Sequence, residues 1–172
     1  MATADNCNGK LHYDNSPIRR QDRLLSEERA TALLREGEYG VLSMVADNGE
    51  AYGVPVNFIY DGADTIYIHC AREGRKLRAI ERHPQVSLCI VGRTRVVPQK
   101  FTTEYESVVV SGHAHTHLSE EEKLKAIDLL LDKLAPDHKQ AGQKATLHSM
   151  PRLEVVKITI DTASGKSKKV AL

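Results

Sequence analysis

The sequence predicts a mainly β fold, an antiparallel barrel with helices packed on its outside. Three strand-like segments, residues 39–46, 51–60 and 65–70, follow one another with only turns between them. Helical segments interrupt the later strands too irregularly for repeated βαβ units, which argues against a doubly wound sheet. Tryptophan is absent and phenylalanine occurs only twice in 172 residues, so aliphatic side chains must fill the core.

A polar arm, residues 1–24, is expected to precede a barrel domain over residues 25–163. Ser26 has the character of a helix N-cap, and the two glutamates after it suit the positive end of the helix dipole. Gly37 is placed to end this first helix.

The first two strands form a predicted hairpin, because the turn sequence Asp47-Asn48-Gly49 separates residues 39–46 from 51–60. Pro55 lacks the N–H that a ladder hydrogen bond needs. The second strand is therefore expected at an edge of the sheet or bulged at this residue.

A third strand, 65–70, leads into a short helix over residues 74–83 that Pro84 stops, and a fourth strand follows over 85–92. The fifth strand, 104–117, is unusually long.

Ser119 and Glu122 then have the spacing of a capping box. Apolar residues recur after them at helical spacing until Pro136: Leu124, Ile127, Leu131 and Leu134. Residues 137–150 are polar and ambiguous. The segment 153–160 alternates as a sixth strand.

The end of the chain, residues 164–172, is basic and is expected to be a solvated tail; a flavin contact from this end stays open as the alternative.

Composition excludes several classes of protein. Lys and Arg total 24 against 23 Asp and Glu, so the basic excess of a generic nucleic-acid surface is missing. No apolar run approaches the roughly 18 to 20 residues that cross a membrane, and the first residues lack the core of an export signal. A cytoplasmic protein is expected.

The three cysteines, Cys7, Cys70 and Cys89, form no CxxC pair, which excludes a zinc ribbon or a thioredoxin-like redox motif. Cys70 and Cys89 lie in apolar segments and are expected to be small buried hydrophobic residues.

Basic residues crowd the start of the short helix after the third strand: Arg72, Arg75, Lys76 and Arg78. Cations there oppose the helix dipole, whereas a bound phosphate would reverse the sign of the interaction. The preceding strand ends at His69, Cys70 and Ala71, so an anion bound there would lie beside a histidine. These residues predict a phosphate-bearing cofactor whose ring lies along the strands; side chains that simply extend into water are the alternative.

The segment Gly53 to Asn57 offers small groups and a proline where the backbone could approach a flat ligand. Asn57 carries both a donor and an acceptor for an amide-like ring edge. An ordinary kinked edge strand is the alternative.

Two runs, VPVNFIYDGADTIYIHCAREGRKLRAIERHPQVSLCIVG and VVPQKFTTEYESVVVSGHA, resemble the flavin-binding split-barrel family related to pyridoxamine 5′-phosphate oxidase. Within that family the likeness is to the 5-nitroimidazole-resistance type. The resemblance covers residues 24–160 and implies a six-stranded antiparallel split β-barrel. It also implies a homodimer with FMN at the subunit interface and a small-molecule substrate.

The resemblance also implies roles for individual residues. Arg75 and Lys76 would bind the FMN phosphate, and His69 would lie beside the flavin with Cys70 and Ala71 next to it. Four residues would line the isoalloxazine ring: Val54, Pro55, Val56 and Asn57. Four more would complete the site from the other subunit: Thr102, Thr103, Tyr105 and Ser107.

The implied activity is an FMN-dependent, nitroreductase-like oxidoreductase in which His69 donates a proton or orients the substrate. The arginine-rich carboxy-terminal segment of pyridoxamine phosphate oxidases proper has no match here, so vitamin B6 oxidation is not expected. A non-catalytic flavin or haem store of the same fold is the alternative.

His113, His115 and His117 would share one face of a strand and could suit a metal ion, although no acidic residue lies among them. We expect no physiological metal there.

Overall fold

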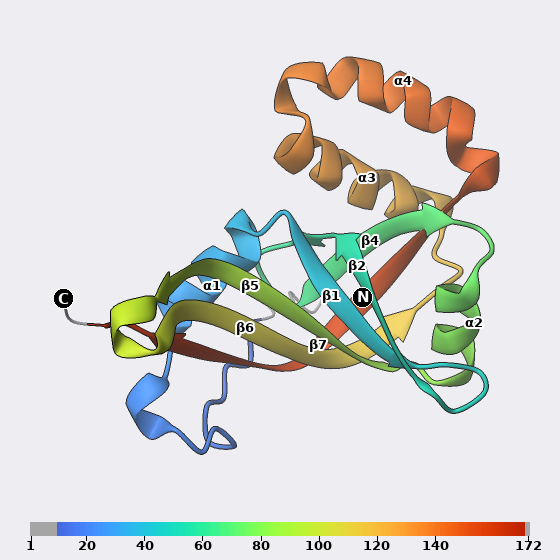
Figure 1. Ribbon diagram of the computed structural model, residues 1–172. Helices are drawn as coiled ribbons and strands as arrows, with labels where there is room; N and C mark the ends of the chain where they lie inside the picture. The colour runs from blue at the N-terminus through green and yellow to red at the C-terminus, as the bar shows by residue number, and fades with distance from the viewer. Residues whose placement is uncertain (1–9, 171–172) are drawn as a thin grey trace, which may run out of the picture.

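The computed structural model describes residues 10–170 and contains one antiparallel sheet rolled into an open barrel, with helices outside it (Figure 1). The strands pair in the order β2-β1-β5-β6-β7-β4-β3. Their bounds are β1 (Tyr39–Val45), β2 (Ala51–Asn57), β3 (Ile59–Tyr60), β4 (Thr65–Ala71), β5 (Gln85–Val97), β6 (Thr102–His115) and β7 (Leu153–Lys168). The helices are α1 (Glu27–Glu36), α2 (Arg75–Arg82), α3 (Glu120–Leu134) and α4 (Lys139–Ser149). Short 3-10 turns are η1 (Gln21–Arg23), η2 (Pro98–Lys100), η3 (Pro136–His138) and η4 (Met150–Arg152).

The mainly β class is confirmed, but the sheet has seven strands where the sequence predicts six. The predicted strand 51–60 is interrupted at Phe58, whose side chain is fully buried in the core. β2 before it pairs only with β1, and β3 after it pairs only with β4. One kinked segment therefore serves both edges of the sheet. The barrel stays split where the free edges of β2 and β4 approach each other.

The last strand runs further than predicted. Residues 164–168, expected in the solvated tail, continue β7 and pair with β6, with Lys168 opposite Tyr105. The register of pairing shifts between Ile160 and Thr162, and beyond this irregularity Ala163 and Gly165 are again buried at a spacing of two residues. A Cβ at Gly165 would come within 2.5 Å of the Tyr13 hydroxyl oxygen.

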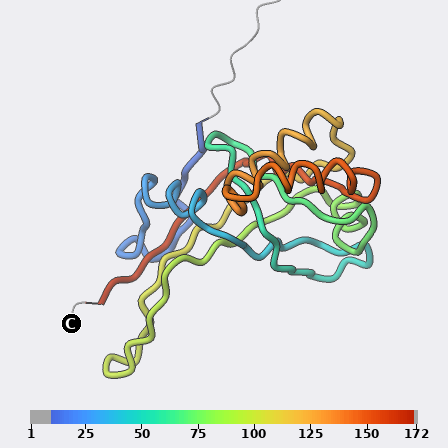
Figure 2. The backbone as a smooth tube through the Cα atoms, turned by 90° about the horizontal axis from the view of Figure 1, so that it is seen from above, coloured from blue at the N-terminus to red at the C-terminus, as the bar shows by residue number. Residues whose placement is uncertain are grey.

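The amino-terminal arm lies against this part of the barrel. Tyr13 bridges to Ala163 and Leu24 bridges to Lys166, and the Tyr13 hydroxyl donates a hydrogen bond to the Leu25 carbonyl oxygen. Figure 2 shows that the β5–β6 hairpin and the end of β7 project together from the body, beside this arm.

The predicted helix starts at Ser26 and Ser119 are confirmed, since each side chain accepts a hydrogen bond from the backbone N–H three residues later. Only half of the capping box forms, because the Glu122 carboxylate is directed at Lys157 and Tyr67. The polar segment after Pro136 folds as α4, which packs on α3 (Figure 1). None of the helices within residues 10–170 is long and apolar enough to span a membrane.

Candidate functional site

A small pocket of about 190 Å³ opens where β4 runs into α2, beside the split of the barrel. Its lining includes five residues that the sequence analysis selected: Val54, Cys70, Ala71, Arg75 and Lys76. Tyr52, Glu73, Gly74 and Leu77 complete it. Tyr52 was missed, although it shares the inward face of β2 with Val54 at a spacing of two residues.

The start of α2 has the features of an anion site. Gly74 precedes the helix at φ 153°, and no side chain caps the free N–H groups of the first turn. That turn contains no acidic residue. The positive end of the helix dipole therefore faces the pocket without an internal counter-charge, although the Glu73 side chain lies next to it.

Of the two cations assigned to a phosphate, Lys76 is the available one. The Arg75 guanidinium stacks over Tyr52 at 4.4 Å from the ring centre and lies 3.6 Å from the Glu50 carboxylate. Lys76 forms no ion pair or hydrogen bond with any residue that the structure describes. Its ammonium is close enough to influence the titration of both His69 and Cys70.

His69 lies near this pocket but does not line it. Along β4, Ile68 and Cys70 face the barrel core, whereas Tyr67 and His69 face outward, and His69 is exposed. The protein around the ring lowers the pKa of His69, and the Lys76 ammonium lowers it further. His69 is thus held neutral at pH 7. Burial raises the pKa of Cys70, despite the opposing effect of Lys76, so the thiol stays protonated.

The predicted ring-lining segment of β2 divides between two faces of the sheet. Val54 and Val56 point inward, and Val56 is buried in the core, so only its main chain can face a surface ligand. Pro55 and Asn57 point outward and are exposed. The Asn57 amide donates a hydrogen bond to the Glu38 carbonyl oxygen at 2.9 Å, which leaves its own oxygen free to accept.

The second predicted group does not join the first within one chain. Thr102, Thr103, Tyr105 and Ser107 lie on β6 after the η2 turn, at the end of the molecule opposite α2 (Figures 1 and 2). The predicted site residues therefore fall into two separate groups, and we call these the Lys76 half-site and the Tyr105 half-site.

The three histidines of the fifth predicted strand do not converge. His113 lies 2.8 Å from the Asp161 carboxylate, whereas His117 lies beyond the end of β6, at φ 59°, and faces Glu81 at 3.3 Å. Within the described residues, no group of three or more ligating side chains could hold a metal ion.

Comparison with known proteins agrees with this fold. A flavocytochrome, Anf3, from Azotobacter vinelandii is 21% identical, with a TM-score of 0.75 over 94% of this chain and 77% of that one. The FAD and heme binding protein from Mycobacterium smegmatis is 20% identical, with a TM-score of 0.74 over 86% and 74%. A candidate 5-nitroimidazole antibiotic resistance protein from Bacteroides thetaiotaomicron is 22% identical, with a TM-score of 0.68 over 84% and 86%.

A search of curated proteins gave no significant match. The family described as Pyridoxamine 5'-phosphate oxidase, in contrast, matches residues 26–167, which include β1 to β6, all four helices and nearly all of β7. The chain therefore belongs to the pyridoxamine 5′-phosphate oxidase family.

Proposed function

We propose that this protein is an FMN-dependent oxidoreductase that works as a homodimer and reduces a small electron-poor compound of the nitroimidazole type. One observation carries the proposal. The start of α2 combines uncapped N–H groups, a Lys76 side chain without a partner among the described residues, and a pocket that opens at the split of the barrel.

The residues present fit a flavin phosphate. A phosphate at the helix start would accept hydrogen bonds from the free N–H groups and pair with Lys76. Tyr52 and Glu50 hold the Arg75 guanidinium nearby. Its ion pair with Glu50 is exposed and therefore weak, so Arg75 could exchange Glu50 for a bound phosphate. The pocket holds the phosphate end only, so the ring must lie outside it, along the free edges of β2 and β4.

The outer face of the sheet supports a homodimer. Four uncharged residues lie side by side across β2, β1, β5 and β6: Pro55, Val41, Cys89 and Val109. A row of serines and a glycine runs parallel to them: Gly53, Ser43, Ser87 and Ser111. A face whose two neighbouring rows carry no charge suits a two-fold interface. The proposal requires that a partner packed there bring its Tyr105 half-site toward the α2 pocket.

A bound FMN would supply the two-electron chemistry. The chain would supply binding and orientation. Because the pKa of His69 is lowered, its imidazole is neutral at pH 7 and can donate one N–H hydrogen bond to a substrate oxygen. The Asn57 carbonyl oxygen can accept from a ring N–H.

The visible absorption spectrum of the purified protein tests the cofactor. Flavin bands that vanish on dithionite reduction are expected, whereas a haem Soret band without flavin would refute the FMN assignment. Lys76→Ala should weaken FMN binding roughly tenfold to a hundredfold, the value of one charged hydrogen bond of about 1.5 to 3 kcal/mol. Arg82→Ala, in the last turn of the same helix, is the matched control and should leave FMN affinity unchanged.

Substitution of His69 distinguishes the proposed enzyme from the alternative, a protein that only stores flavin or haem. His69→Ala should retain FMN stoichiometrically while turnover of a nitroimidazole falls, and His69→Gln, whose carboxamide can still donate an N–H hydrogen bond, should restore part of the rate. Equal rates in all three proteins would remove His69 from the reaction. Flavin that stays bound but fails to transfer electrons to any nitroaromatic acceptor would favour storage.

A further inference from the structure

The described chain contains a second cavity, which shares Tyr105 with the second half-site but extends well beyond it. It is a groove of about 880 Å³ between the start of α1, the β5–β6 hairpin and the end of β7. We infer that this groove binds the diphosphate group of a nucleotide. Its lining residues are Leu24, Leu25, Ser26, Arg29, Arg93, Arg95, Glu104, Tyr105, Glu106, Ser167, Lys168, Lys169 and Val170.

The groove is strongly basic in a chain whose net charge is only +1. Five of its lining side chains are cationic and two are acidic. Like charges gathered in one concavity repel one another and raise the local concentration of anions. The excess therefore points to an anionic ligand.

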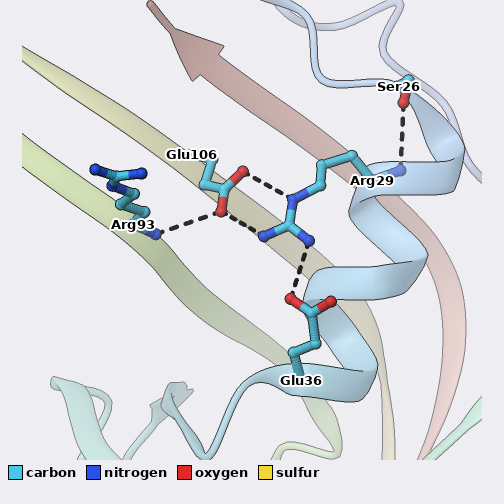
Figure 3. A network of polar contacts seen from close by, with 5 residues as sticks. All are labelled: Ser26, Arg29, Glu36, Arg93 and Glu106. Carbon is cyan, nitrogen blue, oxygen red and sulfur yellow. Dashed lines mark hydrogen bonds and ion pairs between the residues drawn. The ribbon is translucent and has the colours of Figure 1, made fainter.

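Both acidic residues are already neutralised by two of the cations. Glu106 accepts two hydrogen bonds from the Arg29 guanidinium, at 2.6 and 3.0 Å (Figure 3). Glu104 accepts one from Arg95 at 2.5 Å and one from the Val170 N–H at 2.8 Å. These contacts lower the pKa of Glu104 to about 2, so the carboxylate is fully ionised and fully engaged near pH 7.

The side chains of the other three cations form no ion pair or hydrogen bond with a carboxylate among the residues that the structure describes, although Arg93 and Lys169 are close enough to lower the pKa of Glu104 and Glu106, respectively. Arg93 contacts Glu106 only through its backbone N–H, at 3.4 Å, and Figure 3 shows its guanidinium turned away from that carboxylate. Lys168 bonds to the Thr102 hydroxyl, and Lys169 is exposed. Three such charges in one groove match the two to three negative charges of a nucleotide diphosphate.

The rest of the groove suits the remainder of a nucleotide. Tyr105 offers an aromatic ring for a base, and Leu24, Leu25 and Val170 add apolar surface. A volume of about 880 Å³ falls in the range of small-molecule sites, about 300 to 1,000 Å³. The ligand would thus be a whole nucleotide and not an isolated phosphate ion.

Two kinds of molecule contain such a nucleotide diphosphate, and the choice between them rests on the proposed function. One is the adenosine diphosphate half of FAD. The other is a nicotinamide dinucleotide that delivers electrons to the flavin. In a dimer built as proposed, Tyr105 lies in both the groove and the half-site that faces the partner's flavin, so either molecule would bridge neighbouring sites.

Calorimetric titration of the full-length protein with ADP at low salt tests the inference. The double variant Arg93→Ala/Lys169→Ala should bind ADP at least about tenfold more weakly, since each lost charged contact is worth about 1.5 kcal/mol or more. Lys144→Ala/Arg152→Ala removes the same charge from exposed positions in α4 and η4, outside the groove, and should not change ADP affinity. Lys76→Ala should not change it either.

Three outcomes would overturn the inference. The groove variant, Arg93→Ala/Lys169→Ala, could bind ADP as tightly as the native protein does, only Lys76→Ala could lose ADP binding, or the native protein could fail to bind ADP. FMN content, read from absorbance, must stay normal in the groove variant, which separates failure of this inference from failure of the flavin proposal. Displacement of ADP by NADPH, or selective loss of FAD over FMN affinity in the groove variant, supports the inference and identifies the source. Displacement by neither dinucleotide refutes it.

Discussion

The ion pair between Lys123 on α3 and Glu154 on β7 yields the sharpest prediction about stability. The Lys123 ammonium lies 2.8 Å from the Glu154 carboxylate, and the two side chains are only 9% and 8% exposed. Glu154 lies opposite Cys70 in the β4–β7 ladder and also accepts a hydrogen bond from the Val155 N–H. The pair thus fastens the helical layer to the strand that ends at the candidate site.

Lys123→Met would leave the Glu154 carboxylate buried without a counter-charge. Breaking a buried pair in this way costs about 3 to 5 kcal/mol, against about 0 to 1 kcal/mol for an exposed pair. A protein of this length loses about 2 to 4 °C of Tm for each kcal/mol, so the expected decrease is about 6 to 20 °C. The double variant Lys123→Met/Glu154→Gln removes both charges and keeps an acceptor for Val155, so it should recover most of the loss.

The pH dependence has a definite sign. Burial favours the neutral carboxyl, but hydrogen bonds from Lys123 and Val155 outweigh it and leave the pKa of Glu154 below its ordinary value of 4.5. The native protein therefore has the full benefit of the pair above pH 4.5 and loses it as the pH falls through the lowered pKa. In Lys123→Met the pKa of Glu154 should rise. Acid then protonates this carboxylate and removes the unpaired buried charge, so the difference in stability between the variant and the native protein should shrink below pH 5.

Thermal and urea unfolding of the three proteins at pH 7 and pH 4, followed by circular dichroism, measure these differences. A loss below about 1 kcal/mol for Lys123→Met at pH 7 would refute the reasoning, since the pair would then behave as an exposed one. A double variant as unstable as the single one would also refute it, because packing and not charge would then explain the loss.

Three further predictions concern the fold, a titration and the assembly. Phe58→Ala should cost about 3 to 5 kcal/mol in the free energy of unfolding, because it empties the buried position between β2 and β3; a loss under 1 kcal/mol would contradict the role given to the kink. Burial and the nearby Glu122 carboxylate raise the pKa of Tyr67 to about 12, so in an absorbance titration this phenol should ionise about two units above a free tyrosine; ionisation near 10 would disprove its burial against α3. Val109→Arg, on the uncharged outer face, should keep the native circular dichroism spectrum but sediment as a monomer; an unchanged sedimentation coefficient would exclude this face as the interface.

Local patterns were enough to predict most of the fold. Ser26 and Ser119 determine their helix starts through hydrogen bonds within four residues, and the Asn48-Gly49 turn determines the first hairpin without help from the rest of the chain. Where the sequence misled, the cause lies in contacts distant along the chain. Ser164 to Lys168 look like a solvated tail until β6 and the arm provide partners for them.

Local sequence patterns were also enough to predict part of the candidate site, namely the half-site around Lys76. Val54, Cys70 and Lys76 come together because β4 and α2 are consecutive in the chain and β2 lies across the split. The groove was not predictable, because Arg29, Arg93 and Lys169 are separated by more than sixty residues each, and none stands out locally from other exposed cations. Only the rolled sheet shows that both carboxylates of the groove are already paired and that, among the described residues, three of its cations form no ion pair.

The separation of the two half-sites has a consequence for how such a protein works. Within one chain, the phosphate end of a cofactor would be bound at α2 while its ring stayed in water, because the segment expected to complete the site lies at the opposite end of the molecule. A ring left in water is neither oriented nor shielded, and orientation is a large part of what a protein adds to a cofactor. Flavin binding and dimer formation should thus be linked equilibria, each stabilising the other by the same free energy. The uncharged face, which would bind the partner, and the cationic start of α2, which would bind the phosphate, would then depend on each other, although no residue is common to both.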